Sequence, residues 1–562
     1  GGYTTSGPTA IPTVAGGRYP FYSPTGEQRI FYIGRTTPSA GGKYAVMYND
    51  ATTSTTGLNI VDGAYTVTNQ WDGNFVVTLD GTTPDAASNW VTMFTPNALF
   101  TSAPGARITG ESVALSGTHV NTSNAPYGQR SGVSTADLTS ATGLYLGVNA
   151  ADVPVVSIAS GDWNATSTWS GGVVPTCANV AIIANGHTVT SSTSGNFAKG
   201  ISIASGGTLE VSAGDLTVGC TLNNNTLTNN GTLTVSGGLL AVNGNISNAV
   251  GSTFNHTGGN IDIDGNNGGS ATGSVASGTP LLLFLSNNIN LAGGTITIID
   301  PHTATTNTNA VAVKFDTSSA TANSRNTSPS HILQFGDGVS TDAGGNTSGF
   351  FIDSWSTTGY LVIGKLVVNG ATGTNRFVSS RYNLSVRGDI DVEANSTLNL
   401  TTPLVLGGNL LVKVTGNYTN TSGTALNYVT DNTGSNLTFS PVTLPQTITN
   451  NGVMANAVAS PTANLFSLEV NNTNAVGVTL NSPISISGTL TMTSGFINTT
   501  DSNLLTLGTA TVAGTLAGTP SDTNMVRGPF ARTIANANAN TNYILFPVGK
   551  TTYAPIWAAP AT

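Results

Sequence analysis

A repeat of 20 to 24 residues runs through the middle of the chain and limits the folds that it can adopt. Three apolar motifs recur together at these steps: GTLEV at residues 207–211 with GTLTV at 231–235 and GSTF at 251–254, LTV at 216–218 with LAV at 240–242 and IDI at 261–263, and Leu222 with Ile246. A unit of this length buries its apolar face only by stacking on its neighbours. The repeat therefore predicts a solenoid.

Each motif alternates apolar and polar residues, which is the pattern of a β-strand with one buried face. Gly and Asn pairs separate the motifs, where turns need a left-handed backbone. Three strands per repeat predict a right-handed parallel β-helix, whose inward Leu, Ile and Val side chains stack from coil to coil. A β-sandwich is the alternative, but its turns return every 8–12 residues or so. In a β-sandwich, several different strand motifs would not all recur at the same spacing of 24 residues.

The rest of the sequence divides around this repeat. Residues 1–152 have clustered aromatic residues in alternating segments, and they predict an antiparallel β-sandwich. The β-helix is expected over residues 153–520, with a cap at 160–175 and a loop insertion near 301–350, where Thr, Asn and Ser runs break the rhythm. Residues 521–562 contain two apolar strands, which cannot form a core by themselves. These strands are expected to dock on another part of the assembly.

Two tryptophans near the start of the predicted β-helix have a structural interpretation. An open end of a β-helix exposes apolar side chains and unpaired backbone groups. Trp163 and Trp169 lie in the segment just before the first repeats. We therefore expect them to cap the solenoid rather than to form a platform for sugar rings.

Composition excludes several classes of function. Charged residues make up 8% of the chain, against roughly 25% in an ordinary soluble domain, and the net charge is −9. No Lys or Arg occurs between Lys199 and Lys314. A nucleic-acid groove needs clustered cations, so this partner is not expected. No apolar run approaches the roughly 18 residues of a membrane helix, so no membrane span is expected. Abundant Thr, Val and Ile favour an all-β protein of extracellular character.

The two cysteines leave two interpretations open. In a secreted protein, Cys177 and Cys220 could form a disulfide that closes a loop of about 43 residues. Alternatively, they are two unpaired thiols buried as small apolar groups. The chain also begins with Gly1 and Gly2 rather than Met, so we expect a processed product or a piece of a longer chain.

Sites for catalysis or cofactors are not expected. Asp262 and Asp264 share one outward strand face and are weak candidates for a Ca²⁺ site, but the spacing of an EF-hand is missing. Asp337 and Asp342 in a Gly-rich loop are similar candidates. Solvated carboxylates are the favoured interpretation of both pairs. The five histidines fall at no catalytic or metal-ligand spacing, so we predict no catalytic residue, no cofactor and no enzyme.

Two other functions were weighed for a β-helix. A carbohydrate-binding or carbohydrate-cleaving protein is the main alternative, and cleavage requires converging carboxylates. Ice binding would use outward threonines such as Thr232 and Thr234, or Thr295 and Thr297. The threonine pattern is interrupted, because Glu210 takes a matching position. Ice binding is therefore not favoured.

Several motifs resemble one known class of secreted protein. They are SGDW at residues 160–163 with STWSGGVVP at 167–175, NGHTV at 185–189, VTL at 478–480 with SGTLT at 487–491 and NLLTLG at 503–508, and FPVG at 546–549 with YAP at 553–555. This set resembles large, repetitive, type IX-secreted surface or adhesin-like proteins of Bacteroidota. The resemblance covers most of residues 160–562. It implies an extracellular or cell-surface location more than an activity.

The resemblance also implies a mode of assembly. In that family the FPVG strand usually continues into a sandwich similar to residues 18–148. Here the order is reversed, because the sandwich stands at the N-terminus and the FPVG strand near the C-terminus. Residues 523–562 of one subunit would then complete the sandwich of the next by β-strand complementation, giving a head-to-tail filament. Alternatively, the sequence is one register cut from a covalent tandem array. Surface glycans are a second class of partner. The residues expected at the subunit interface are Tyr19, Phe21, Phe31, Tyr543, Phe546 and Trp557.

Overall fold

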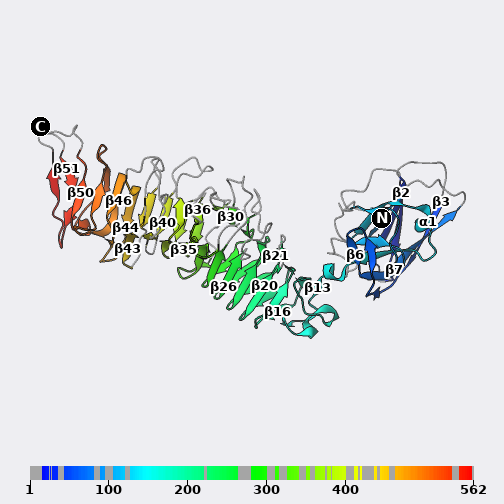
Figure 1. Ribbon diagram of the computed structural model, residues 1–562. Helices are drawn as coiled ribbons and strands as arrows, with labels where there is room; N and C mark the ends of the chain where they lie inside the picture. Colours follow the sequence, from blue (N-terminus) through cyan, green and yellow to red (C-terminus); the bar gives the residue numbers. More distant parts are fainter. Residues whose placement is uncertain are drawn as a thin grey trace. The chain divides into compact units, whose positions relative to one another are not determined.

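The protein is described by a computed structural model, shown in Figure 1. It divides into two compact units, Gly1–Val155 with Ala178–Val180, and Val156–Cys177 with Ala181–Thr562. Each unit is described by itself. The structure describes the chain except for residues 1–15, 25, 27, 36–42, 81–88, 95–105, 121–126, 221–224, 264–279, 300–310, 316–325, 341–349, 355–360, 374–375, 381–382, 400–410, 415–417, 421–435, 440–443, 453, 455–462, 535–542 and 560–562.

The first unit consists of two antiparallel sheets. One sheet has the order β1 (Gly16–Tyr22), β2 (Gln28–Arg35), β8 (Asn89–Phe94), β11 (Tyr127–Val133) and β10 (Thr118–His119). The other has the order β3 (Lys43–Asn49), β7 (Asn69–Asp80), β12 (Leu144–Val148) and β9 (Arg107–Thr109), and β4 (Ser54–Thr55) also pairs with β7. A separate hairpin is formed by β5 (Ile60–Asp62) and β6 (Tyr65–Val67).

Aromatic side chains from both sheets form the core of this unit. Phe31, Trp71 and Phe75 are fully buried, and the Phe31 and Phe75 rings stack with centroids 5.0 Å apart. The Trp71 indole N–H donates to the backbone oxygen of Ala51 at 2.9 Å, so its one polar atom is satisfied. Large aromatic rings bury much apolar area per residue. This explains how a unit with little charge and short strands has a continuous core.

Most of the second unit is a parallel β-helix, in which each coil contributes strands to long sheets (Figure 1). The first sheet contains β14 (Gly161–Asp162), β16 (Thr188–Ser191), β19 (Thr208–Val211), β22 (Thr232–Val235), β25 (Thr253–His256), β28 (Asn288–Leu291) and β31 (Asn326–Thr327). The second contains β15 (Val180–Ile183), β18 (Gly200–Ile203), β21 (Asn225–Asn229), β24 (Gly244–Asn248), β27 (Leu282–Phe284), β30 (Val311–Phe315), β33 (Phe350–Ser354), β36 (Arg376–Ser380) and β39 (Ser396–Asn399).

The third sheet continues furthest toward the C-terminal side. It contains β17 (Asn196–Ala198), β20 (Asp215–Val218), β23 (Leu239–Val242), β26 (Asn260–Ile263), β29 (Thr295–Ile298), β32 (Ile332–Phe335), β34 (Leu361–Ile363), β35 (Lys365–Val368), β37 (Leu384–Val386), β38 (Ile390–Val392), β40 (Leu411–Val414), β41 (Tyr418–Asn420), β42 (Asn436–Phe439), β43 (Gln446–Asn450), β44 (Leu465–Asn471), β45 (Val478–Leu480), β46 (Ile484–Asn498), β47 (Leu505–Leu507), β48 (Thr515–Gly518), β49 (Asn524–Arg527), β50 (Phe530–Arg532) and β52 (Val548–Gly549).

The remaining elements are short. Two strands, β51 (Ile544–Phe546) and β53 (Ile556–Ala558), form an antiparallel hairpin. The others are α1 (Thr135–Leu138), η1 (Ala150–Asp152), β13 (Val155–Val156), η2 (Thr166–Thr168) and η3 (Ser170–Gly172). The described residues include no helix long and apolar enough to cross a membrane. The fold is thus all-β, with a parallel β-helix and an antiparallel two-sheet unit, as the sequence predicted.

The strand registers confirm two of the predicted repeats. Leu209 pairs with Leu233 on the next coil, 24 residues on. Leu216 pairs with Leu240, which in turn pairs with Ile261, at the steps read from the sequence. The inward side chains of these strands are fully buried. The stacked apolar columns therefore follow directly from the periodic sequence.

Other alignments of the repeat were wrong. Leu233 pairs with Phe254, so the step to the third GTLEV-like motif is 21 residues rather than 20. Ile246 pairs with Leu227 and not with Leu222, which lies outside the described residues. The reason is that Gly and Asn corners of variable length separate the strands. Local similarity identifies a strand more reliably than it identifies that strand's neighbour.

The later coils also differ from the expected spacing. Leu366 pairs with Ile390, and Leu384 pairs with Leu361, so the 18-residue step between LVV and LSV is not a coil repeat. Residues 301–350 were expected as a loop insertion. They instead include β30, β31 and β32, which continue the three sheets between segments that the structure does not describe. Long polar connections concealed these strands in the sequence.

Glycines at one corner of the β-helix stack on each other. Gly238 and Gly259 have φ of 64° and 72°, in the left-handed region that favours glycine. A Cβ atom at Gly238 would lie 2.3 Å from the backbone oxygen of Gly214, and one at Gly259 would lie 2.6 Å from that of Gly238. Close backbone approach between coils thus explains why Gly recurs at this position of the repeat.

Candidate interaction surfaces

The N-terminal end of the β-helix is closed by the cap segment. Trp163 and Trp169 are fully buried, with their rings edge to face and 5.0 Å between centroids. The Trp169 indole N–H donates to the backbone oxygen of Trp163 at 2.6 Å, and the Trp163 backbone N–H donates to Thr190 of β16. η2 and η3 flank Trp169. The two side chains therefore occupy the position that a cap requires, on the first coil of the solenoid.

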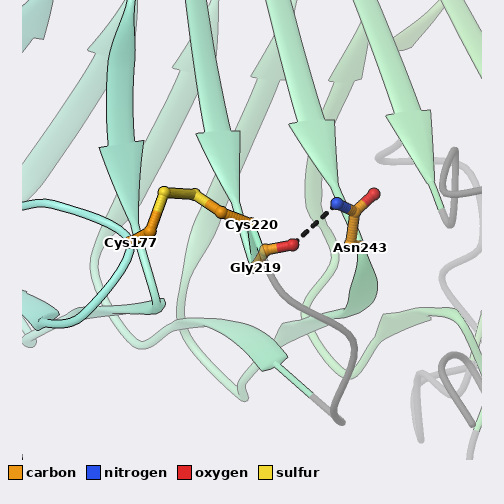
Figure 2. Close-up of a disulfide and its surroundings, with 4 residues drawn as sticks. All are labelled: Cys177, Gly219, Cys220 and Asn243. Carbon is orange, nitrogen blue, oxygen red and sulfur yellow. Dashed lines mark hydrogen bonds between the residues drawn. A yellow bond between two sulfur atoms is a disulfide. The ribbon is translucent and has the colours of Figure 1, made fainter.

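A disulfide ties this end together (Figure 2). Cys177 follows the cap segment, Cys220 follows β20, and their Cα atoms are 5.3 Å apart. Beside the bond, the Asn243 side-chain amide donates to the Gly219 backbone oxygen at 2.6 Å, which links the next coil to the same corner. Of the two interpretations that the sequence left open, the structure has the disulfide.

The C-terminal end of the β-helix is built differently. Its last parallel strands, β48, β50 and β52, pair with the preceding β46, β47 and β49, and no described strand follows them in parallel. None of the side chains of β48 and β50 is fully buried, in contrast to the inward residues of the earlier coils. The hairpin of β51 and β53 lies beside β50 at this end (Figure 1). This end leaves apolar surface uncovered among the described residues.

The terminal hairpin and the residue before it carry three exposed large apolar side chains. Trp557 is 58% exposed, and Tyr543 and Ile556 are exposed to a similar extent. Phe546 is half-buried and packs edge to face against Phe530, with ring centroids 6.1 Å apart. Tyr543 and Trp557 are thus free to contact a partner, whereas Phe546 mainly attaches the hairpin to its own β-helix. Ile556 was not singled out from the sequence, although its place beside Trp557 on a short strand was a signal for it.

The three expected interface residues of the sandwich lie elsewhere. Phe31 is fully buried in the core, and Tyr19 and Phe21 pack against that core from β1. The Tyr19 hydroxyl donates to the backbone oxygen of Tyr44 on the facing sheet at 3.2 Å. These residues hold the two sheets together within one chain. The terminal strands are also used internally, because β49 and β50 pair in parallel with β46 and β47.

The predicted acidic pairs are only partly described. Asp262 is half-buried on β26, and burial raises its pKa, while a hydrogen bond from Thr297 acts in the opposite direction and nearby Asp337 adds to the increase. For Asp337, burial acts to raise the pKa, but hydrogen bonds from Ser340 and Val339 outweigh it, and the pKa is lowered. Asp264 and Asp342 lie outside the described residues. Asp262 and Asp337, from separate coils, thus interact electrostatically.

No metal centre is found in the part of the chain that the structure describes. Three or more His, Cys, Asp or Glu side chains that could hold an ion do not converge there. Asp337 instead accepts hydrogen bonds from the backbone N–H groups of Val339 and Ser340, at 2.9 and 2.7 Å. Its carboxylate thus serves a local turn.

A buried histidine pair was missed by sequence reasoning. His256 on β25 and His331 before β32 are 75 residues apart, and His256 Nδ1 lies 3.1 Å from His331 Nε2. Both are buried, and burial lowers the pKa of His256 to about 4. Burial, with the neighbouring His256, lowers the pKa of His331 to about 3. Only the stacking of distant coils brings the two rings together, so no local motif marks them.

Comparison with known proteins adds no homologue. No protein-family model matches the chain, and no curated protein or solved structure matches it either. The interpretation of its surfaces therefore depends on the geometry described above.

Proposed function

We propose that the protein is an extracellular structural protein, a subunit or repeat of a bacterial surface filament or adhesin that assembles head to tail. The observation that carries this proposal is the difference between the two ends of the β-helix. One end is closed by buried tryptophans and a disulfide, whereas the other has half-exposed last strands and an exposed aromatic hairpin. Exposed apolar surface beside a sheet edge is typical of a site for strand addition.

Other features support an extracellular structural role. A disulfide persists in oxidising compartments and is rare in the cytosol. The low charge of 8% limits repulsion between copies that pack along their lengths. A parallel β-helix carries load along its axis through many backbone ladders, each coil contacting only its neighbours. The proposed mechanism is therefore mechanical, with the ladders resisting extension and the ends transmitting force between subunits.

The test is whether the purified full chain polymerises. We expect sedimentation velocity to show mass that increases with protein concentration, and electron microscopy to show filaments one β-helix wide. A chain that stays monomeric at every concentration would contradict self-assembly. Filaments held by covalent continuity, in a longer expressed array, would support the tandem-array alternative instead.

One observation favours the runner-up, a carbohydrate-cleaving β-helix. Asp262 and Asp337 interact electrostatically and have pKa values shifted in opposite directions, as general acid and base pairs often do. Under this alternative, Asp262→Asn would abolish release of reducing ends from a panel of neutral polysaccharides. Wild-type protein that releases none from the panel would leave the pair with a structural role.

A further inference from the structure

The sandwich unit has one described edge strand, β3, that is both long and without Pro. Sheet edges in proteins are commonly made very short or interrupted by Pro, since open edges recruit other strands. Here β9 and β10 have three and two residues, and β1 contains Pro20. β3 has seven residues, KYAVMYN, no Pro, and one charged residue, Lys43, at its first position. Within the described residues, β3 pairs with β7 on one side only.

The side chains of β3 suit a contact. Met47 is 56% exposed, and a flexible methionine adapts to irregular apolar surfaces. On the other face of the strand, Val46 and Tyr48 pack against the core, so the backbone of β3 is firmly held. The Tyr48 ring lies 5.1 Å from that of Phe75. A rigid strand with an open backbone edge and an exposed apolar side chain can accept a further strand with little loss of conformational entropy.

The terminal hairpin has matching properties. β53 pairs with β51 on one side, and its other edge has no partner strand among the described residues. Its first two residues, Ile556 and Trp557, are both exposed. Edge strands that carry exposed aromatic residues are good candidates for burial at an interface, because aromatic anchors contribute much of the binding energy.

Charge favours this pairing over the association of two identical ends. Residues 521–562 have three cations, Arg527, Arg532 and Lys550, and one carboxylate, whereas residues 1–152 have nine carboxylates and six cations. Near the two edges, Asp50 is exposed directly after β3, and Lys550 is exposed between β52 and β53. Opposite charges at the rim of an interface guide the orientation of the partners.

We propose that β3 is the acceptor edge for a second copy of this chain, and that the donor is the hairpin strand β53. The inference rests on the proposed function, which it makes specific. It replaces the expected contact through Tyr19, Phe21 and Phe31 with one through β3 and Met47. The sandwich of one copy gains a strand at its open edge, and the exposed Trp557 side chain becomes buried.

Lysine substitutions in the full chain test the proposal. Met47→Lys and Trp557→Lys each place a charge in the contact at an exposed position, so the fold should be kept, as circular dichroism and thermal unfolding would verify. We expect each to raise the concentration needed for assembly about tenfold or more. Tyr22→Lys is the matched control, because Tyr22 is 52% exposed on β1, the Pro-containing edge. It should assemble like wild type.

Cysteine cross-linking identifies the partner directly. A Met47→Cys chain mixed with a Trp557→Cys chain should form an intermolecular disulfide, and a Tyr22→Cys chain with Trp557→Cys should not. Cross-links between two Met47→Cys chains alone would show symmetric β3 pairing and overturn the proposal. Wild-type assembly that Met47→Lys leaves unchanged would overturn the acceptor edge while the proposed function stands. Wild-type protein that remains monomeric would overturn both.

Discussion

The two ends of the β-helix solve the same problem in different ways. Every solenoid has a first and a last coil with apolar residues and backbone groups that no further coil covers. At the N-terminal end, Trp163 and Trp169 are fully buried and the disulfide fixes the nearby corner. At the C-terminal end, the last parallel strands are half-exposed and Trp557 is 58% exposed. Tryptophan side chains are thus buried at one end of the β-helix and exposed at the other.

The difference separates a structural role from an interaction role. A buried tryptophan with a satisfied N–H contributes to the stability of its own chain, as Trp169 does. An exposed tryptophan on a hairpin contributes little to folding and much to a contact that buries it. The closed end therefore defines where the solenoid begins, and the open end is the surface that the proposed assembly would use.

The largest expected effect on stability comes from replacing one tryptophan at each end, Trp169 or Trp557, by alanine. Trp169→Ala removes a fully buried ring and should lower the free energy of unfolding by about 3–5 kcal/mol. Trp557→Ala removes an exposed ring and should change it by less than about 0.5 kcal/mol. Denaturant unfolding of the monomer measures both. Equal losses in the two variants would break the contrast between the ends.

Removing the disulfide should loosen only the closed end. The double variant Cys177→Ser, Cys220→Ser opens a loop with a sequence separation of 43 residues, and should lower stability by about 4 kcal/mol. We expect faster hydrogen exchange in β16, β17 and β20 by mass spectrometry. Exchange in β48 and β50 serves as the internal control and should not change. Uniformly faster exchange along the β-helix would mean that the bond acts on the whole solenoid.

Acid should destabilise the β-helix at the His256–His331 pair, between its two ends. The pKa of His256 is about 4 in the folded chain, against about 6.5 when unfolded. Because the unfolded chain binds this proton more readily, protonation disfavours the fold. The contribution of this group to the free energy of unfolding therefore stays level above about pH 6.5 and decreases as the pH falls toward 4. For His256 alone the loss is about 3 kcal/mol. His331, whose pKa is lower still, acts in the same direction.

A leucine pair provides the control for this pH dependence. Leu291 follows His256 in the same interior column, so the double variant His256→Leu, His331→Leu replaces the polar pair by a side chain that this column already contains. Unfolding midpoints at pH 7 and pH 4 should differ less in the variant than in wild type. If both lose the same stability in acid, carboxylates elsewhere are responsible.

The smallest expected effect is fraying at the open end of the unmodified monomer. Coils of a solenoid are stabilised by their neighbours, so a coil covered on one side opens more often. Amide exchange should therefore be faster in β48 and β50 than in β16 and β19. Assembly should slow exchange in β53 and β3 most. Slow exchange at the open end in dilute protein would show that it is already closed without a partner.

The predictability of the fold differs along the chain. In the region with short corners, the columns of Leu209 and Leu216 could be read from the sequence, because strands of equal length recur at one offset. Beyond residue 300, long polar segments separate the strands, and the 18-residue step that joined Leu366 to Leu384 was wrong. Sequence spacing measures the connection as well as the coil, so long connections conceal the register.

The candidate sites show the same limit. Trp163 and Trp169 were identified because their place before the first repeat already implied an end to be covered. Phe31 was assigned to an interface, although the structure buries it in the sandwich core. An aromatic residue in an alternating strand has the same sequence pattern whether its strand faces a core or a partner. Burial distinguishes the two, and it depends on the opposite sheet.

By itself, the sequence determined the all-β class and the solenoid, because these follow from local periodicity and from the shortage of charge. Only the tertiary structure decided which strands are neighbours, that β3 has a partner on one side only among the described strands, and that His256 meets His331. Each of these depends on contacts between residues far apart in the chain. Such contacts are set by how coils and sheets stack, which no short stretch of sequence specifies.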